Sequence, residues 1–137
     1  MFALHSFLEL PIPTANTTVL FLYYQHNLKG DDNLRFTSFL ESGQLTVALT
    51  GEIDHHCAKE YIQTIIAKIE AYTPKVCILD FRDVTFMDSS GIAVVINAMR
   101  NMTRIDGSLI LTGLNDQPMK VFRASGIDKL IEIKEAV

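Results

Sequence analysis

The sequence predicts an α/β domain built on a mixed β-sheet of about four to five strands, with an N-terminal hairpin and with helices packed on the sheet. Three observations predict this class. Two β-prone runs flank a short Ser-Gly turn, helix-like and strand-like patterns alternate after them, and one run of strand length is almost wholly apolar. Strands that alternate with helices are typical of β-α units, and two runs joined by a short turn are typical of a hairpin.

The expected hairpin opens the ordered part of the chain. Residues 34–40 and 45–49 are its two strands, and Ser42-Gly43 is the turn between them. The second run alternates apolar with polar residues, as a strand does when one of its faces is buried.

The first helix follows Asp54, which is expected to cap it by accepting hydrogen bonds from free backbone N–H groups. Apolar residues recur over 58–72 at the i, i+3, i+4, i+7 spacing of an amphipathic helix. Pro74 is expected to end this helix. The almost wholly apolar run 76–81 comes next, and its composition predicts a strand buried on both faces.

The second helix is expected over 92–99, directly after Asp88-Ser89-Ser90, whose side chains suit the start of a helix. Gly107 is expected to end it in a left-handed conformation. Residues 109–112 form the fourth expected strand.

The C-terminal part is expected to hold a short helix and the last strand. Pro118 opens that helix, which runs through Ala124, and Gly126 closes it. The run 130–133 is expected to return to the edge of the sheet.

Composition narrows the classes of protein. A chain of 137 residues, 48% of them apolar, can bury roughly two thirds of its unfolded surface without metals or disulfides. A net charge of -4 disfavours nucleic acid as a partner. Cys57 and Cys77 fit no disulfide framework, and the longest early apolar run, 19–24, is far shorter than the ~20 residues of a membrane span. We expect a cytoplasmic protein with no membrane or nucleic-acid partner and no cofactor.

A turn-prone cluster at 30–33 divides the chain. Residues 34–137 are expected to form the domain, and residues 1–33 an N-terminal extension of uncertain structure. Lys29-Gly30-Asp31 can be encoded by a purine-rich stretch that resembles a ribosome-binding site. One hypothesis is therefore that the extension is translated upstream sequence and not native.

Enzyme and metal motifs are not matched. His55-His56-Cys57 has no second His or Cys pair at ligand spacing, so no metal site is predicted. The nucleophile elbow G-x-S-x-G is absent around Ser89, and so is a Gly-rich phosphate loop. We expect no enzyme activity. Taken alone, residues 88–91 are simply a good helix cap.

Two motifs together carry a family resemblance. Met87-Asp88-Ser89-Ser90-Gly91, with Gly51-Glu52-Ile53-Asp54-His55-His56 before it, resembles STAS domains, and among them the anti-sigma factor antagonists of the sporulation type, called SpoIIAA. The resemblance runs from Leu34 to the C-terminus. It implies the STAS fold.

The resemblance also implies a regulatory role. The unphosphorylated protein would bind an anti-sigma factor that is also a serine kinase and so release the sigma factor, phosphorylation of Ser89 would abolish binding, and a serine phosphatase would reset the protein. Asp54 would contact a basic group of the kinase. The implied partner-binding residues are Asp54, Asp88, Ser89, Ser90, Gly91 and Ile92. Two alternatives stay open, a general-stress anti-sigma antagonist and a STAS subunit of a membrane transport complex, and the Asp54-His55-His56 tripeptide favours the sporulation type.

Elementary electrostatics is compatible with such a switch. A serine at the start of a helix either caps backbone N–H groups or is exposed. A phosphate there would add roughly -1.5 to -2 charges, and the helix N-terminus would stabilise it. The new charge would lie beside Asp88, and near Asp54 if the two loops share one edge of the sheet.

Overall fold

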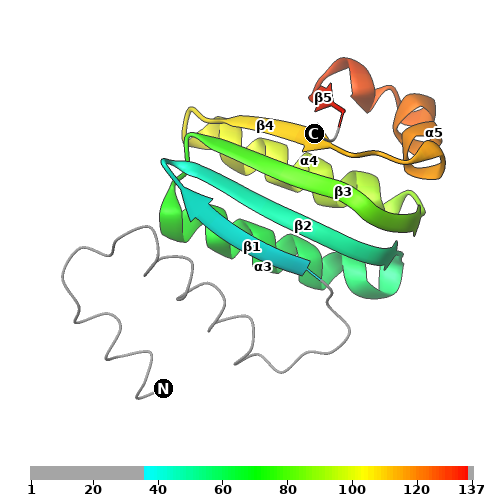
Figure 1. Cartoon of the computed structure of the whole chain (residues 1–137), viewed down its shortest axis with the longest axis horizontal. Coiled ribbons are helices and arrows are strands. Elements are labelled where there is room, and N and C mark those ends of the chain that lie inside the picture. The colour runs from blue at the N-terminus through cyan, green and yellow to red at the C-terminus, as the bar shows by residue number, and fades with distance from the viewer. Residues whose placement is uncertain (1–35, 136–137) are drawn as a thin grey trace.

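The computed structural model describes residues 36–135, which form one layer of β-sheet with helices packed on it (Figure 1). In chain order the elements are β1 (Phe36–Glu41), β2 (Gln44–Ile53), α3 (His55–Tyr72), β3 (Val76–Met87), α4 (Ser90–Arg104), β4 (Ser108–Thr112), α5 (Asp116–Ser125), the 3-10 helix η1 (Ile127–Lys129) and β5 (Glu132–Lys134). The predicted α/β class is confirmed. The expected extension 1–33 lies outside the described residues.

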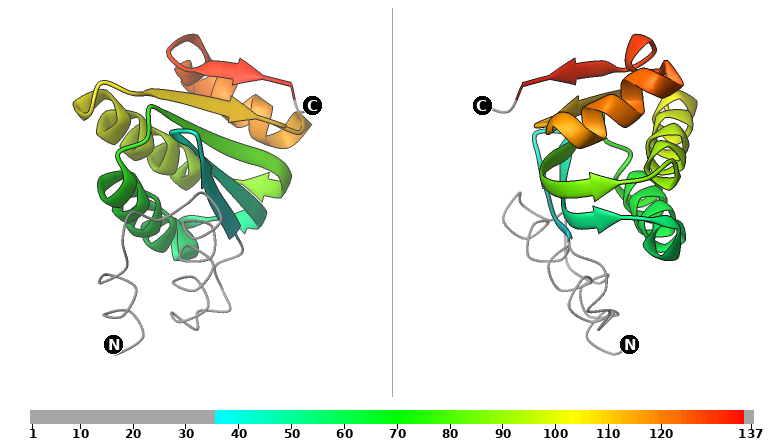
Figure 2. Two further views of the ribbon diagram at one scale, coloured as in Figure 1. Left: turned by 60° about the vertical axis from the view of Figure 1, so that its left-hand side comes forward. Right: turned by 90° about the vertical axis from the view of Figure 1, so that its right-hand side faces the viewer.

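The sheet has five strands in the order β1-β2-β3-β4-β5. β1 pairs with β2 antiparallel, and the other three pairings are parallel, so the predicted mixed sheet is confirmed. Helices α3 and α4 lie side by side on one face of the sheet, and α5 lies at the β4 end (Figures 1 and 2). The core lies between the sheet and these helices.

The hairpin turn forms where the sequence predicts it. Ser42 and Gly43 both have positive φ, 53° and 79°, as a two-residue hairpin turn requires. Leu45, Val47 and Leu49 of β2 are fully buried, while the residues between them are partly exposed. The alternation in the sequence therefore reports which face of β2 meets the helices.

The strands β2 and β3 extend further than predicted. β2 continues to Ile53 instead of ending at 49, and β3 continues to Met87 instead of ending at Phe81. Two register shifts in the β2–β3 ladder accommodate the polar residues, which stay exposed while Phe81, Val84 and Met87 are buried. Bulges change the period of burial from two to three, so alternation does not reveal this part of β3.

The end of α4 differs from the prediction at Gly107. The left-handed residue is Asp106, with φ 60°, and Gly107 has no positive φ. The N–H of Gly107 bonds to the carbonyl of Met102, and that of Asp106 to Thr103, which is a Schellman motif. Gly107 is needed for space instead, because a Cβ there would lie 3.0 Å from the carbonyl oxygen of Lys75. The helix itself, 90–104, is longer than the predicted 92–99.

The C-terminal elements follow the predicted order. Gly126 ends α5 in the left-handed conformation, with φ 80°, as expected. The last strand pairs with β4 at the sheet edge, but it spans 132–134 and not 130–133, because the unpredicted η1 comes first and leaves Leu130 73% exposed. No helix within residues 36–135 combines the length and apolarity needed to cross a membrane.

Candidate functional site

The two loops that carry the sequence motifs lie side by side at one edge of the sheet. β2 and β3 are parallel neighbours, and Ile53 pairs with Met87 at their C-terminal ends. The N–H of Asp88 donates to the carbonyl of Ile53 at 3.1 Å. Figure 2 shows the two strand ends next to each other before they lead into α3 and α4. The expected proximity of Asp54 and Asp88 is therefore confirmed at the level of their loops.

Asp54 caps α3, as predicted. Its Oδ1 accepts hydrogen bonds from the N–H groups of His56 at 2.9 Å and Cys57 at 3.3 Å. Desolvation tends to raise the pKa of Asp54, but these two N–H donors and the nearby His56 outweigh it, so the pKa lies below the ordinary 3.8. Both of these N–H groups bind Oδ1, and Asp54 is half-exposed.

Asp88 takes the capping role in the second loop. Its Oδ1 accepts from the N–H of Ser90 at 2.7 Å, and its carbonyl accepts from Gly91 at 3.0 Å. Ser89 occupies the N-cap position of α4 with helical φ and ψ of -62° and -16°, and its side chain makes no capping bond. Of the two options for a serine at a helix start, Ser89 takes the exposed one.

The three residues after Ser89 are less exposed than Ser89 itself. Ser90 and Ile92 are half-buried, and Ile92 packs on the edge of the core. Gly91 is buried, and a Cβ there would lie 2.5 Å from Cε and 3.3 Å from Cβ of Met87. Gly91 therefore has a packing role, and its contact with a partner stays a prediction.

An exposed aromatic residue at this edge was not singled out from the sequence. Phe86 is 42% exposed and pairs in register with Glu52, which is exposed on β2. Alternation could not identify it, because Thr85 and Phe86 are both exposed in the bulged part of β3. Two further residues that strand periodicity could not reveal, Asn115 and Gln117, bond to the outer side of β3.

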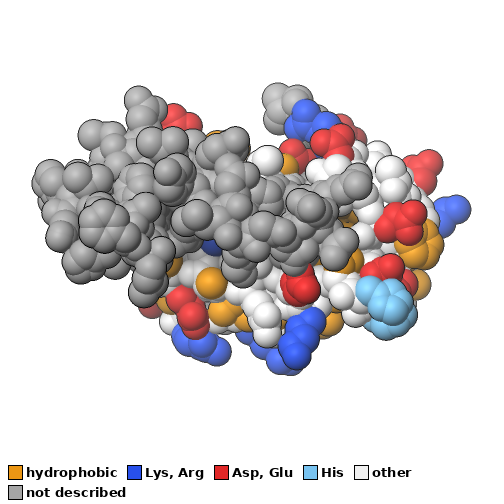
Figure 3. Space-filling model, turned by 90° about the horizontal axis from the view of Figure 1, so that it is seen from below, with side chains coloured by type: hydrophobic (Ala, Val, Ile, Leu, Met, Phe, Trp, Pro, Cys, Tyr) orange, Lys and Arg blue, Asp and Glu red, His pale blue; other side chains and the backbone are white. Residues whose placement is uncertain are grey.

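The surface around the start of α3 carries two histidines together with acidic and hydrophobic side chains. The ring centroids of His55 and His56 are 3.9 Å apart, and Figure 3 shows these histidines beside acidic and hydrophobic side chains at one end of the molecule. Within residues 36–135, no three His, Cys, Asp or Glu side chains gather closely enough to hold a metal ion.

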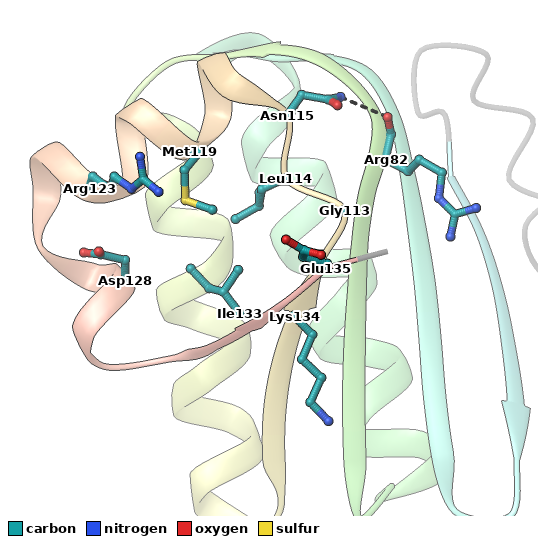
Figure 4. A pocket seen from close by; sticks show the side chains of 10 residues that line it. All are labelled: Arg82, Gly113, Leu114, Asn115, Met119, Arg123, Asp128, Ile133, Lys134 and Glu135. Atoms are coloured by element: carbon teal, nitrogen blue, oxygen red, sulfur yellow. Dashed lines mark hydrogen bonds between the residues drawn. The ribbon is translucent and has the colours of Figure 1, made fainter. Parts of the chain in front are cut away.

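A separate hollow of about 580 Å³ lies between α5, η1 and the end of β4 (Figure 4). Its walls include Leu114, Met119 and Ile133, with Arg123 and Asp128 facing it from α5 and η1. No residue of the two motifs lines it, and Arg82 is the residue that β3 contributes to its lining. The hollow is thus distinct from the Asp54–Ser89 edge.

The fold and this edge define a class of α/β domain that presents an unengaged serine at a helix N-terminus beside two capping aspartates. A family model described as the STAS domain matches residues 39–137, and the chain belongs to the STAS domain family.

Relatives and solved structures show which proteins of this kind the chain is similar to. The anti-sigma-B factor antagonist of Listeria monocytogenes is 29% identical over 97 residues, which is 69% of this chain and 82% of the relative. The anti-sigma F factor antagonist of Lysinibacillus sphaericus is 34% identical over 83 residues, covering 61% and 71%. The structure of the anti-sigma factor antagonist SpoIIAA in its unphosphorylated form matches with a TM-score of 0.67 and 28% identity, over 75% of this chain and 89% of that chain. The phosphorylated Bacillus SpoIIAA matches with a TM-score of 0.62 at the same identity, over 75% and 92%.

Proposed function

We propose that this protein is an anti-anti-sigma factor whose binding is switched by phosphorylation of Ser89. The unphosphorylated form binds an anti-sigma factor that is also a serine kinase, and this binding frees the sigma factor. Phosphorylation ends the complex, and a serine phosphatase restores it. The protein acts as a binding module and kinase substrate and catalyses no reaction. The observation that carries the proposal is the exposed hydroxyl of Ser89, which makes no capping bond, at the edge shared with Asp54.

Exposure and backbone position favour Ser89 over its neighbour. Ser89 is exposed, whereas Ser90 is half-buried and already lies in the first turn of α4 with its N–H bound to Asp88. A kinase must bring a hydroxyl in line with the γ-phosphate of ATP, so the accessible hydroxyl is the better acceptor.

Charge explains how the modification would weaken binding. A phosphate on Ser89 adds roughly -1.5 to -2 charges next to Asp88 and on the same edge as Asp54 and Glu52. The N–H groups of α4 help to stabilise the phosphate within the fold. A surface that accepts this edge with its present charge would have to desolvate the dianion, and a loss of about 1.4 kcal/mol already weakens binding tenfold.

A partner contact of Asp54 is compatible with its cap. Both N–H groups of α3 bind Oδ1 of the half-exposed Asp54, so a basic group of the kinase can approach the carboxylate while the cap stays in place. Relatives named as anti-sigma factor antagonists support this class of partner, and SpoIIAA, a similar protein, is known in unphosphorylated and phosphorylated forms.

The test combines a kinase assay with binding. The cognate anti-sigma kinase and ATP are incubated with wild type, Ser89→Ala and Ser90→Ala protein, and the modified residue is located by mass spectrometry. Phosphate is expected on wild type and on Ser90→Ala but not on Ser89→Ala. Phosphate at position 90 of Ser89→Ala would contradict the choice of residue.

Binding measurements then test the charge mechanism. Ser89→Asp is expected to bind the kinase at least tenfold more weakly than wild type, while Ser89→Ala binds as wild type does. Ser90→Asp, one residue further along, is the matched charge control. Equal affinity of wild type and Ser89→Asp would refute the mechanism.

A second candidate is control of general stress rather than sporulation. The anti-sigma-B factor antagonist of Listeria monocytogenes favours it, whereas Asp54-His55-His56 favours the sporulation type. Capture of the partner from extracts of the native host, followed by identification of its sigma factor, separates the two. A membrane ATPase captured instead would support the transport-complex alternative.

A further inference from the structure

Among residues 36–135, no strand pairs with one side of the part of β3 that leads to Ser89. β4 pairs with β3 only from Val76 to Asp80, where Thr112 is the last partner. From Arg82 to Met87, the described residues give β3 a neighbouring strand, β2, on one side only. Backbone groups on the other side, around the buried Val84 and Met87, must find other partners, because an unpaired buried group costs free energy.

The side chain of Gln117 takes the place of the missing strand at Met87. Its Oε1 accepts from the N–H of Met87 at 2.8 Å, and its Nε2 donates to the carbonyl of Met87 at 2.8 Å. This pair of bonds has the donor and acceptor arrangement of a backbone bridge between strands. Met87 is fully buried and comes immediately before Asp88. Gln117 therefore holds the residue from which the Ser89 loop departs.

Asn115 also bonds the backbone of β3, at residues that precede Met87. Its Nδ2 donates to the carbonyls of Arg82 and Val84, both at 3.0 Å, and Figure 4 shows the bond to Arg82. Asn115 is the N-cap residue of α5, yet its side chain makes no capping bond. Asparagine is among the preferred N-caps, so its use on β3 gives up a local stabilisation for a distant contact.

Met87 transmits this restraint to the start of α4. Gly91 in the first turn of α4 packs so closely on Met87 that a Cβ at Gly91 would lie 2.5 Å from Met87 Cε. The other side of the loop is fixed by the bond from Asp88 to Ile53 on β2. Ser89 thus lies between the end of β3, where Gln117 bonds Met87, and the start of α4, where Gly91 packs on Met87.

We infer that Asn115 and Gln117 are positioning residues for the Ser89 loop, which they hold in the geometry that the kinase reads. The inference rests on the proposed function for its biological readout. The restraint itself, from Gln117 through Met87 to the loop, is a property of the fold and is measured without any partner.

The first measurement is hydrogen exchange resolved by residue. Gln117→Ala is expected to speed exchange of the Met87 N–H at least about fivefold, as the loss of one hydrogen bond implies, while amides of α3 keep their rates. Gln117→Glu places a carboxylate oxygen where the amide donates to the Met87 carbonyl, so the two oxygens repel each other and exchange of the Met87 N–H is expected to be faster than in wild type as well. Lys120→Ala, at an exposed position on the same helix, is the matched control. It is expected to change the exchange rate of neither the Met87 N–H nor the amides of α3.

The second measurement is the rate of Ser89 phosphorylation by the cognate kinase. Gln117→Ala and Asn115→Ala are expected to lower kcat/KM several-fold, with Lys120→Ala unchanged and the unfolding curves of all variants still cooperative. If Gln117→Ala does not fold, Gln117→Glu and Asn115→Ala give the same comparison. Unchanged Met87 exchange in a folded Gln117→Ala protein would overturn the restraint, and faster exchange with unchanged phosphorylation would overturn the positioning role. If wild type is not phosphorylated at all, the proposed function fails, and the exchange result still decides whether the restraint exists.

Discussion

The loops β2–α3 and β3–α4 are built alike, and they differ in what they leave free. Each follows a parallel strand, and each uses an aspartate to bind the first N–H groups of a helix. In the first loop the capping aspartate is itself the N-cap residue, with extended backbone. In the second, Asp88 caps from one position earlier, and Ser89 fills the N-cap position without using its hydroxyl.

Because of that shift by one residue, the fold presents an exposed serine without losing a helix cap. The helix start is already stabilised by Asp88, so the hydroxyl of Ser89 is not needed for folding. The β2–α3 loop has no such spare residue, because Asp54 is followed directly by His55 in α3. Substitutions at matching positions in the two loops therefore show which side chains the fold needs and which are exposed without a structural role.

The largest effect on stability is expected at Gly91, the third residue after Asp88. Gly91→Val forces Met87 aside in a filled core, and overpacking of this kind costs about 2 kcal/mol of unfolding free energy. Cys57 is the third residue after Asp54 and is only half-buried, so Cys57→Val is expected to cost less than about 1 kcal/mol. Urea unfolding of both variants measures the difference, and equal losses would remove this contrast between the loops.

Loss of the capping carboxylates comes next. Asp88→Ala is expected to lower the unfolding free energy by about 1 kcal/mol, while Asp88→Asn keeps the cap and most of the stability. Asp54→Ala is also destabilising, and Asp54→Asn is less so, because the amide keeps an acceptor for the cap but not the charge. Thermal unfolding of the four variants tests whether both aspartates stabilise the start of their helix. A stable Asp88→Ala protein would show that Ser89 can replace the cap.

A near-zero effect is expected at Ser89 itself. Ser89→Ala removes an exposed hydroxyl that makes no capping bond, so the unfolding free energy is expected to stay within about 0.5 kcal/mol of wild type. Denaturant unfolding followed by circular dichroism measures this. A clear loss of stability would mean that the hydroxyl has a structural partner, and the comparison of the loops would fail.

The finest test is the titration of Asp54. Its pKa lies below 3.8 in the folded protein, because hydrogen bonds from His56 and Cys57 outweigh desolvation. A lowered pKa means that the carboxylate stabilises the fold above the unfolded pKa and that this contribution is lost as the pH falls through the folded pKa. NMR titration of the side-chain carboxyl is expected to give a midpoint below the ordinary value. A midpoint at or above it would contradict the cap geometry.

The order of elements and both motif loops could be predicted because they depend on local patterns. The turn at Ser42-Gly43, the cap at Asp54 and the ending at Gly126 each follow from the chemistry of one or two residues. The family resemblance added the proposed role of Ser89, which the helix-cap chemistry alone does not supply.

Other features depend on contacts between distant segments, and these could not be predicted. β3 reaches Met87 because β2 pairs with it and amide side chains some thirty residues later bond its free side. Gly107 is a glycine because backbone of the α3–β3 connection passes close to it, and not because of a left-handed turn. Periodicity describes a segment by itself and contains no information about such neighbours.

The unused hydroxyl of Ser89 has a consequence for signalling. Since folding does not depend on that oxygen, the modified and unmodified molecules are expected to keep the same fold. On the proposed function, the response would then follow the fraction of molecules that are modified, because each unmodified molecule occupies one kinase. Sharp thresholds would have to arise from the enzymes that add and remove the phosphate, because the domain itself stores no energy to release.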